Sequence, residues 1–83
     1  MAGKTEIHEF VQGILASAGD QEPLADDESL ILSGRLQSID AVEIIAFLEE
    51  KFGIDFAEIG FEREQIDTVD AMYVLAKAHS NRN

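Results

Sequence analysis

The sequence predicts a small all-α domain with three main helices, a short fourth helix and one long first connection. Apolar residues recur at helical spacing in three segments, and no segment of useful length alternates between apolar and polar residues as a strand would. Glycine or proline stands between these segments. With 83 residues, the chain is long enough for one compact domain. We therefore expect residues 1–83 to form a single domain with an ordered core over about 5–79.

The first helix is predicted over residues 5–18, with Gly19 as its expected end. Its apolar residues recur at spacings of three, one, three and one: Ile7, Phe10, Val11, Ile14 and Leu15. Residues 19–37 then form a long connection that contains Pro23 and Gly34. Loops of this length are usually functional or firmly anchored. We expect its apolar residues to pack it down onto the core: Leu24, Leu30, Ile31, Leu32 and Leu36.

The second helix is predicted over residues 38–52, with Ser38 as its N-cap and Gly53 as its end. One face carries the residues expected in the core: Ala41, Ile44, Ile45, Leu48 and Phe52. The opposite side combines three apolar residues with glutamates: Ile39, Val42 and Ala46 among Glu43, Glu49 and Glu50. Single exposed apolar residues are normal, and the long loop could cover them. Alternatively, this side is a docking strip for a partner with apolar contacts and basic side chains.

Residues 54–67 are predicted to be irregular, with a short helical turn near 62–66. Their expected anchors in the core are apolar: Ile54, Phe56, Ile59, Phe61 and Ile66. Thr68 is the expected cap of a last helix over residues 69–79, with Asp70 in its first turn. The stripe of this helix consists of Val69, Met72, Tyr73 and Ala76. We expect the tail, residues 79–83, to be frayed.

The charge of the chain is strongly negative. Seventeen Asp and Glu residues oppose six Lys and Arg residues, which gives a formal net charge of −11. A field of this sign repels nucleic acid and anionic membranes, so neither is expected as a partner, and it favours basic partner surfaces. A high net charge also keeps a small protein soluble, so the charge alone names no partner.

The chain has no cysteine, which excludes disulfides, thiolate metal sites and cysteine catalysis and fits a reducing cytosol. Its N-terminal segment, MAGKTEIHEF, has no long apolar run, so we expect neither a signal peptide nor a membrane span. The protein is therefore expected to be cytoplasmic, and we expect a monomer. An acidic cluster in the first connection lacks the spacing of a calcium-binding loop, and we predict no metal site.

Residues 34–52 read GRLQSIDAVEIIAFLEEKF and resemble the modification motif of acyl carrier proteins. In that family a serine opens a helix of the form Ser-Leu-x-x-Val-Glu-Leu-x-x-x-Leu-Glu-Glu-x-Phe. Nine positions over fifteen residues match: Ser38, Ile39, Val42, Glu43, Ile44, Leu48, Glu49, Glu50 and Phe52. Leu30 and Leu36 upstream, and residues 66–69 downstream, also fit the family, so the resemblance spans about 5–77.

The resemblance implies a right-handed four-helix bundle with a long first loop. It also implies that a phosphopantetheinyl transferase moves 4′-phosphopantetheine from coenzyme A onto Ser38. The thiol of that arm would carry an acyl or aminoacyl group as a thioester in fatty acid, polyketide or specialised-metabolite biosynthesis. Further partners would be loading ligases or synthases with basic docking patches. The implied docking residues surround Ser38 along the helix: Gln37, Ile39, Asp40, Val42, Glu43, Ala46, Glu49 and Glu50.

The sequence departs from the family pattern beside Ser38. Gln37 stands where the family usually has aspartate, and Arg35 is expected to weaken the local negative field further. Ala46 is smaller, and Phe47 larger, than the family's usual residues. These departures leave a second hypothesis open, that of an unmodified acidic helical module for protein–protein interaction. An enzyme is not predicted, because neither histidine lies near Ser38 in the sequence and the carboxylates show no evident pairing.

Overall fold

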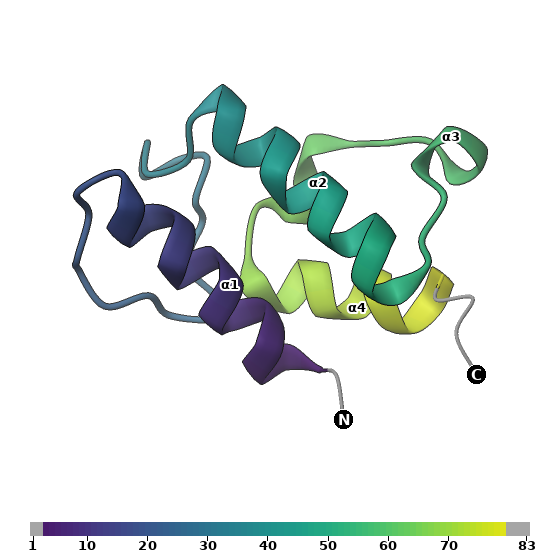
Figure 1. The fold of residues 1–83 in the computed structure, drawn as a ribbon, viewed down its shortest axis with the longest axis horizontal. Coiled ribbons are helices and arrows are strands. Elements are labelled where there is room, and N and C mark those ends of the chain that lie inside the picture. Colours follow the sequence, from purple (N-terminus) through teal and green to yellow (C-terminus); the bar gives the residue numbers. More distant parts are fainter. Residues whose placement is uncertain (1–2, 80–83) are drawn as a thin grey trace.

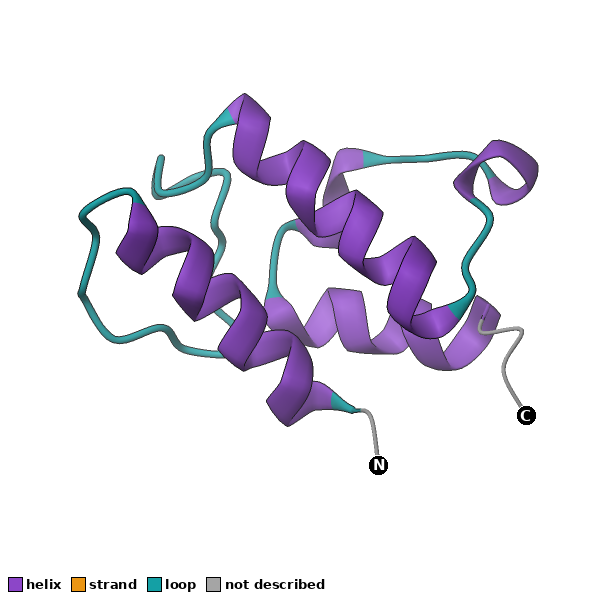
Figure 2. Cartoon of the chain, in the orientation of Figure 1, coloured by secondary structure: helices purple, strands orange, loops and turns teal. Residues whose placement is uncertain are grey.

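Helices form every regular element in the described part of the chain, residues 3–79 of a computed structural model (Figures 1 and 2). Three long helices and two short elements follow one another: α1 (Lys4–Ser17), α2 (Ser38–Phe52), α3 (Phe56–Ile59), the 3₁₀ helix η1 (Arg63–Ile66) and α4 (Val69–His79). The predicted all-α bundle with a long first loop is confirmed. Of the tail expected to fray, residues 79–83, His79 is the last residue of α4, and residues 80–83 lie outside the described residues.

The helices α1 and α2 lie side by side and run in opposite directions (Figure 1). Near the middle of both helices the rings of Phe10 and Phe47 stack with their centroids 4.0 Å apart. Lys51 Nζ lies 3.0 Å from the carboxylate of Glu6, nearer the start of α1 and the end of α2. The buried face of α1 consists of residues predicted for it: Ile7, Val11, Ile14 and Leu15. The predicted pattern thus places α1 on the core, with Phe10 only partly buried at its edge.

The core face of α2 is confirmed. Ile44 and Leu48 are fully buried, and Phe52 is nearly so. Ala41 and Ile45 are partly buried against the same cluster. Gly53 ends the helix with a φ of 70°, a left-handed conformation that glycine adopts without steric cost. Because α2 buries the predicted face against the core, its opposite side faces away from the core.

The last helix packs against α1 and η1. Thr68 caps it as predicted, because its Oγ1 accepts the backbone N–H of Ala71 at 2.9 Å. The buried residues are Val69, Met72, Leu75 and Ala76, whereas Tyr73 is only partly buried. Lys4 Nζ lies 2.9 Å from the Asp70 carboxylate and so joins the first turn of α1 to the first turn of α4.

The connection between α2 and α4 holds one helix that we did not predict. In α3, Asp55 accepts backbone N–H bonds from Ala57 at 3.0 Å and Glu58 at 3.3 Å. Gly60 follows with a φ of 83°, so the helix lasts for four residues only. Such a helix is too short for an apolar period to reveal it. The turn predicted near 62–66 is confirmed as η1.

The helix α1 begins and ends one residue earlier than the predicted range of 5–18. The helix α1 ends at Ser17, and Gly19 follows it with a φ of 92°. Within residues 3–79, no helix is long and apolar enough to cross a membrane.

Candidate functional site

Ser38 is the first residue of α2, and its side chain is exposed at the end of the helix. We expected Ser38 to be the N-cap, but Gln37 occupies that position. The Asp40 carboxylate accepts the backbone N–H of Gln37 at 3.1 Å, so the helix start is stabilised from the third helical position. The Ser38 hydroxyl is therefore not needed as a cap, and it makes no hydrogen bond within residues 3–79.

Asp40 was predicted to be a docking residue, but the structure buries it. Its side chain turns back toward the backbone of Gln37, and the residue is only 6% exposed. A carboxylate at this position commonly folds back in this way to bind a free N–H group at a helix start. Asp40 therefore shapes the start of α2 and does not belong to an outer surface.

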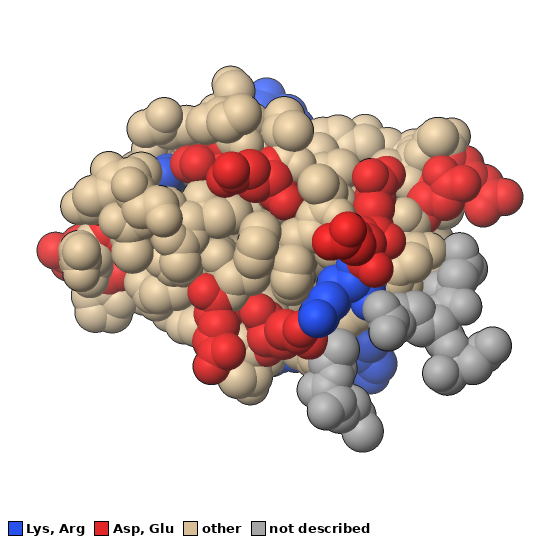
Figure 3. Space-filling model, in the orientation of Figure 1, with Lys and Arg blue, Asp and Glu red and all other residues tan. Residues whose placement is uncertain are grey.

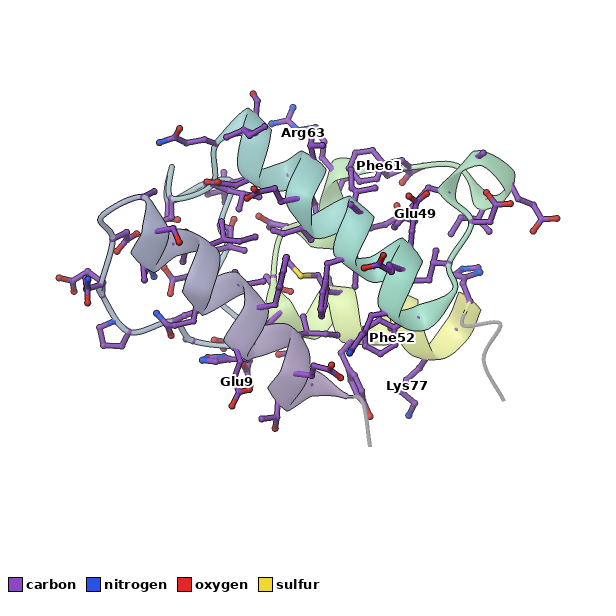
Figure 4. All side chains as sticks on the ribbon, in the orientation of Figure 1. Glu9, Glu49, Phe52, Phe61, Arg63 and Lys77 are labelled. Atoms are coloured by element: carbon purple, nitrogen blue, oxygen red, sulfur yellow. The ribbon has the colours of Figure 1, made fainter. Side chains whose placement is uncertain are left out.

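The other predicted docking residues are exposed, and the long loop does not cover them. Ile39 is 62% exposed and Val42 is 60% exposed, although both are apolar. Exposed carboxylates and a small residue accompany them on the helix: Glu43, Glu49, Glu50 and Ala46. Figure 4 shows Glu49 and Phe52 on different sides of α2, as the predicted two-faced helix requires. We call Ile39, Val42 and Ala46 with these glutamates the outer strip.

Leu32 is exposed, although we expected it to anchor the long loop. It is 88% exposed, whereas Leu30 is fully buried. Asp67 holds this part of the loop, because its carboxylate accepts the Ser29 hydroxyl at 2.7 Å and the backbone N–H of Ile31 at 3.0 Å. The turn thus buries Leu30 and directs Leu32 outward. The sequence carries no signal that separates these two leucines, so the prediction missed the exposure of Leu32.

Arg35 also differs from its expected role. Its guanidinium lies 2.8 Å from the Asp20 carboxylate and 2.9 Å from the Glu28 carboxylate. It also donates to two backbone carbonyl oxygens of the loop, at 2.9 and 3.1 Å. With its side chain only 12% exposed, Arg35 closes the long loop onto itself. Its charge is paired with these two carboxylates, a placement that the sequence did not predict.

The Arg35 contacts change the acidity of the groups involved. Hydrogen bonds from Arg35 hold the pKa of the Asp20 carboxyl and of the Glu28 carboxyl below their ordinary values. The same bonds raise the pKa of the Arg35 guanidinium. Both carboxyls have a lower pKa in the folded chain, so the unfolded chain binds more protons in acid. Their contribution to stability is therefore present above roughly pH 4.5 and is lost as the pH falls through the folded-state pKa values.

This linkage predicts the pH dependence of an Arg35 variant. We expect Arg35→Met to lower the urea midpoint of unfolding at neutral pH, and we expect its difference from the wild type to shrink below roughly pH 4. Arg35→Lys keeps a cation without the guanidinium fork, so its urea midpoint should fall between those of Arg35→Met and the wild type. Urea unfolding followed by circular dichroism at several pH values measures this. A difference that stays constant into acid would show that the two carboxylates do not stabilise the loop through their charge.

Three acidic side chains of the long loop, those of Asp20, Asp26 and Glu28, are paired with basic side chains. Besides the Arg35 contacts, Asp26 Oδ1 lies 2.8 Å from His8 Nδ1 on α1. Among residues 3–79, no group of three or more His, Cys, Asp and Glu side chains is arranged to hold a metal ion.

The comparisons with known proteins bear on this arrangement. No family model and no solved structure matches the chain. The chain is 36% identical over 76 residues to the D-alanyl carrier protein of Lactobacillus acidophilus, a match that covers 87% of this chain and 94% of that relative. The chain belongs to the acyl carrier protein family.

The start of α2 fits a phosphopantetheine group, which membership of the acyl carrier protein family implies. The first backbone N–H groups of a helix have no acceptor within it, and the helix dipole places a partial positive charge there. A phosphodiester on the exposed Ser38 hydroxyl would meet that end of α2. Ser38 could therefore hold the group without any rearrangement of the buried side of the helix.

Proposed function

We propose that this acyl carrier protein carries an aminoacyl group as a thioester on a 4′-phosphopantetheine arm attached to Ser38. The observation that carries the proposal is the exposed Ser38 hydroxyl at the start of α2, with the uncovered outer strip beside it. A carrier needs both features, because a modifying enzyme must reach the hydroxyl while it holds the protein. We propose that the whole chain acts as one such carrier domain, and that it is not itself an enzyme.

The attachment would be a transfer from coenzyme A catalysed by a separate phosphopantetheinyl transferase. The Ser38 oxygen forms a bond to phosphorus as the bond from phosphorus to the adenosine 3′,5′-bisphosphate breaks, and the hydroxyl proton passes to a base of the transferase. The chain supplies no base, because His8 is paired with Asp26 and His79 lies at the end of α4. Once attached, the arm supplies the thiol that forms the thioester with the cargo.

The partners would be the transferase and the ligase or synthase that loads the arm. Their basic side chains would meet Glu43, Glu49 and Glu50, and their apolar side chains would meet Ile39 and Val42. Gln37 is exposed next to Ser38 and offers a hydrogen bond where most carriers offer a negative charge. We therefore propose that the transferase for this chain tolerates a neutral residue there. Since the donor is coenzyme A, we propose the cytoplasm as the compartment.

The relative from Lactobacillus acidophilus supports an aminoacyl cargo. That protein is a D-alanyl carrier by name, and the match covers nearly its whole length. We therefore place D-alanine ahead of the fatty acyl and polyketide intermediates that the family pattern alone also allows.

Intact mass spectrometry tests the attachment. We expect the chain to gain the mass of one phosphopantetheine when it is incubated with coenzyme A and a promiscuous transferase, and we expect Ser38→Ala to gain none. Ser33→Ala, which removes a nearby exposed serine in the loop, is the matched control and should be modified like the wild type. No gain under conditions that modify another carrier would instead favour the unmodified interaction module.

The modified chain then tests the cargo. With ATP and a D-alanine-activating ligase, we expect a further gain of one alanyl group that hydroxylamine removes, as it removes thioesters. Efficient loading by a fatty acyl ligase, without loading of D-alanine, would contradict the aminoacyl proposal but would leave the attachment to Ser38 intact.

A further inference from the structure

Arg63, on η1, is the one Lys or Arg side chain within residues 3–79 that has no partner in the chain. It is exposed, and neither Glu62 nor Glu64 beside it in the sequence forms an ion pair with it. The other basic side chains are engaged: Lys4, Arg35 and Lys51 with carboxylates, and Lys77 with the ring of Tyr73. Because the chain has 17 Asp and Glu residues, a guanidinium without a carboxylate partner is unusual here and is available to another anion.

The element that carries Arg63 is joined to the segment in front of Ser38. Ile66, the last residue of η1, is 2% exposed and fixes the element in the core. The backbone N–H of Leu30 donates to the carbonyl oxygen of Asp67 at 2.7 Å, directly after η1. The N–H of Leu36 donates in turn to the carbonyl oxygen of Leu30 at 3.4 Å. Since Leu36 precedes Ser38 by two residues, these bonds tie η1 to the start of α2.

The Arg63 side chain extends toward that end of α2. Figure 4 shows its guanidinium beside the first turns of the helix, in agreement with the hydrogen bonds that join the two segments. Figure 3 shows that acidic side chains far outnumber basic ones on this face of the molecule. Beside Ser38, however, Gln37 is neutral, and the Asp40 carboxylate binds the Gln37 N–H at 3.1 Å. Neither residue therefore supplies an exposed carboxylate for Arg63.

We propose that Arg63 is a positioning residue that binds the phosphodiester of the arm on Ser38. This inference rests on the proposed attachment to Ser38. A guanidinium can donate two parallel N–H groups to two oxygens of one phosphate. The start of α2 presents its own N–H groups and the positive end of the helix dipole to the same group. The phosphodiester would thus be held between Arg63 and α2.

The attachment makes such a pair stronger than an ordinary surface ion pair. Exposed ion pairs contribute little, because holding two free side chains together costs entropy. A phosphodiester on Ser38 is tethered to the same chain as Arg63, so its effective concentration there is high. The pair would fix the first part of the arm at the start of α2 and so limit the directions in which its thiol can extend.

Phosphorus-31 NMR of the modified chain tests the pair. The reference is the same modified chain unfolded in urea, in which the phosphodiester has no folded surroundings. We expect the folded wild type to show a signal displaced from this reference, and we expect Arg63→Gln to lose at least about half of the displacement. Arg63→Lys should lose less than Arg63→Gln, because it keeps the charge without the fork. The matched control Lys77→Gln removes one positive charge from α4 and should keep the displacement.

The Arg63 side chain provides a second readout. Its Nε–H signal in proton–nitrogen NMR should move when the unmodified chain gains phosphopantetheine. It should return toward its original position in about 1 M NaCl, where charges are screened beyond about 3 Å. An arginine with a purely structural role would not respond to the modification. Because Arg63 is exposed, Arg63→Gln should keep the urea midpoint of the unmodified wild type.

The outcomes distinguish this inference from the proposed attachment. Absence of a mass gain would overturn the attachment to Ser38 and this inference with it. A modified chain whose phosphorus signal is the same in the wild type and in Arg63→Gln would overturn only the role of Arg63. Slower transfer to Arg63→Gln with an unchanged phosphorus signal would likewise overturn that role and assign Arg63 to contact with the transferase.

Discussion

Replacing Leu48 with alanine is expected to lower the free energy of unfolding by about 2–5 kcal/mol. Leu48 is fully buried on the core face of α2, and the substitution leaves a cavity that the surrounding helices fill only in part. Small domains have a total stability of about 5–15 kcal/mol. The loss is therefore a large share of the stability of this chain, and a visible unfolded fraction at 37 °C is expected.

Urea unfolding followed by circular dichroism measures this effect, and the chain supplies a matched control. Leu32→Ala removes the same atoms from a leucine that is almost fully exposed, so its stability should change by less than about 0.5 kcal/mol. If the two variants lost equal stability, Leu48 would not be the core residue that the structure shows.

Replacing Val42 with aspartate should slow transfer of phosphopantetheine to Ser38 by about 10- to 100-fold, the loss expected from one residue at the centre of an interface. Val42 lies on the outer strip one turn after Ser38. An aspartate at this position would remove an apolar contact with the partner and would place an unpaired carboxylate against the partner's apolar surface. Glu43→Lys should act in the same direction, because it would repel a basic partner surface. The free energy of unfolding of both variants should stay within about 0.5 kcal/mol of the wild-type value, since both residues are exposed.

The initial rate of mass gain, measured against concentration of the unmodified chain, gives kcat/KM for each variant. The control is Val74→Asp, the same change at a valine that is 64% exposed on α4, and it should alter the rate less than about twofold. Transfer to Val42→Asp and Glu43→Lys at the wild-type rate would show that the outer strip is ordinary surface to the transferase.

Much of this fold could be predicted because its helices are long and strongly periodic. The core face of α2, the Thr68 cap and the end at Gly53 each depend on residues close together in the sequence. Asp40 and Leu32 were assigned wrongly because their places depend on three-dimensional contacts. A carboxylate three residues after an N-cap can turn inward or outward, and here it binds the Gln37 backbone. Asp67, 36 residues away from Ile31, orients the turn that exposes Leu32.

Arg35 could not be placed from the sequence for the same reason. Its partners Asp20 and Glu28 lie 15 and 7 residues earlier, and an arginine beside an acidic cluster can face either the cluster or the solvent. The contact between α1 and α2 likewise depends on which residues of two separate helices meet. The small Ala46 and large Phe47 were visible as departures from the family pattern, but only the stacking of Phe47 on Phe10 gives them a common location.

The closed first loop has a consequence for the conditions under which the protein can work. Arg35 and Asp20 join positions 15 residues apart, a separation that small secreted domains often bridge with a disulfide. This chain has no cysteine, so its cross-link is ionic and contains no bond that a thiol reagent can break. Reductants and oxidants should therefore leave the segment in front of Ser38 in place. If Ser38 carries the proposed thiol arm, redox chemistry at that sulfur would leave this ionic cross-link unchanged.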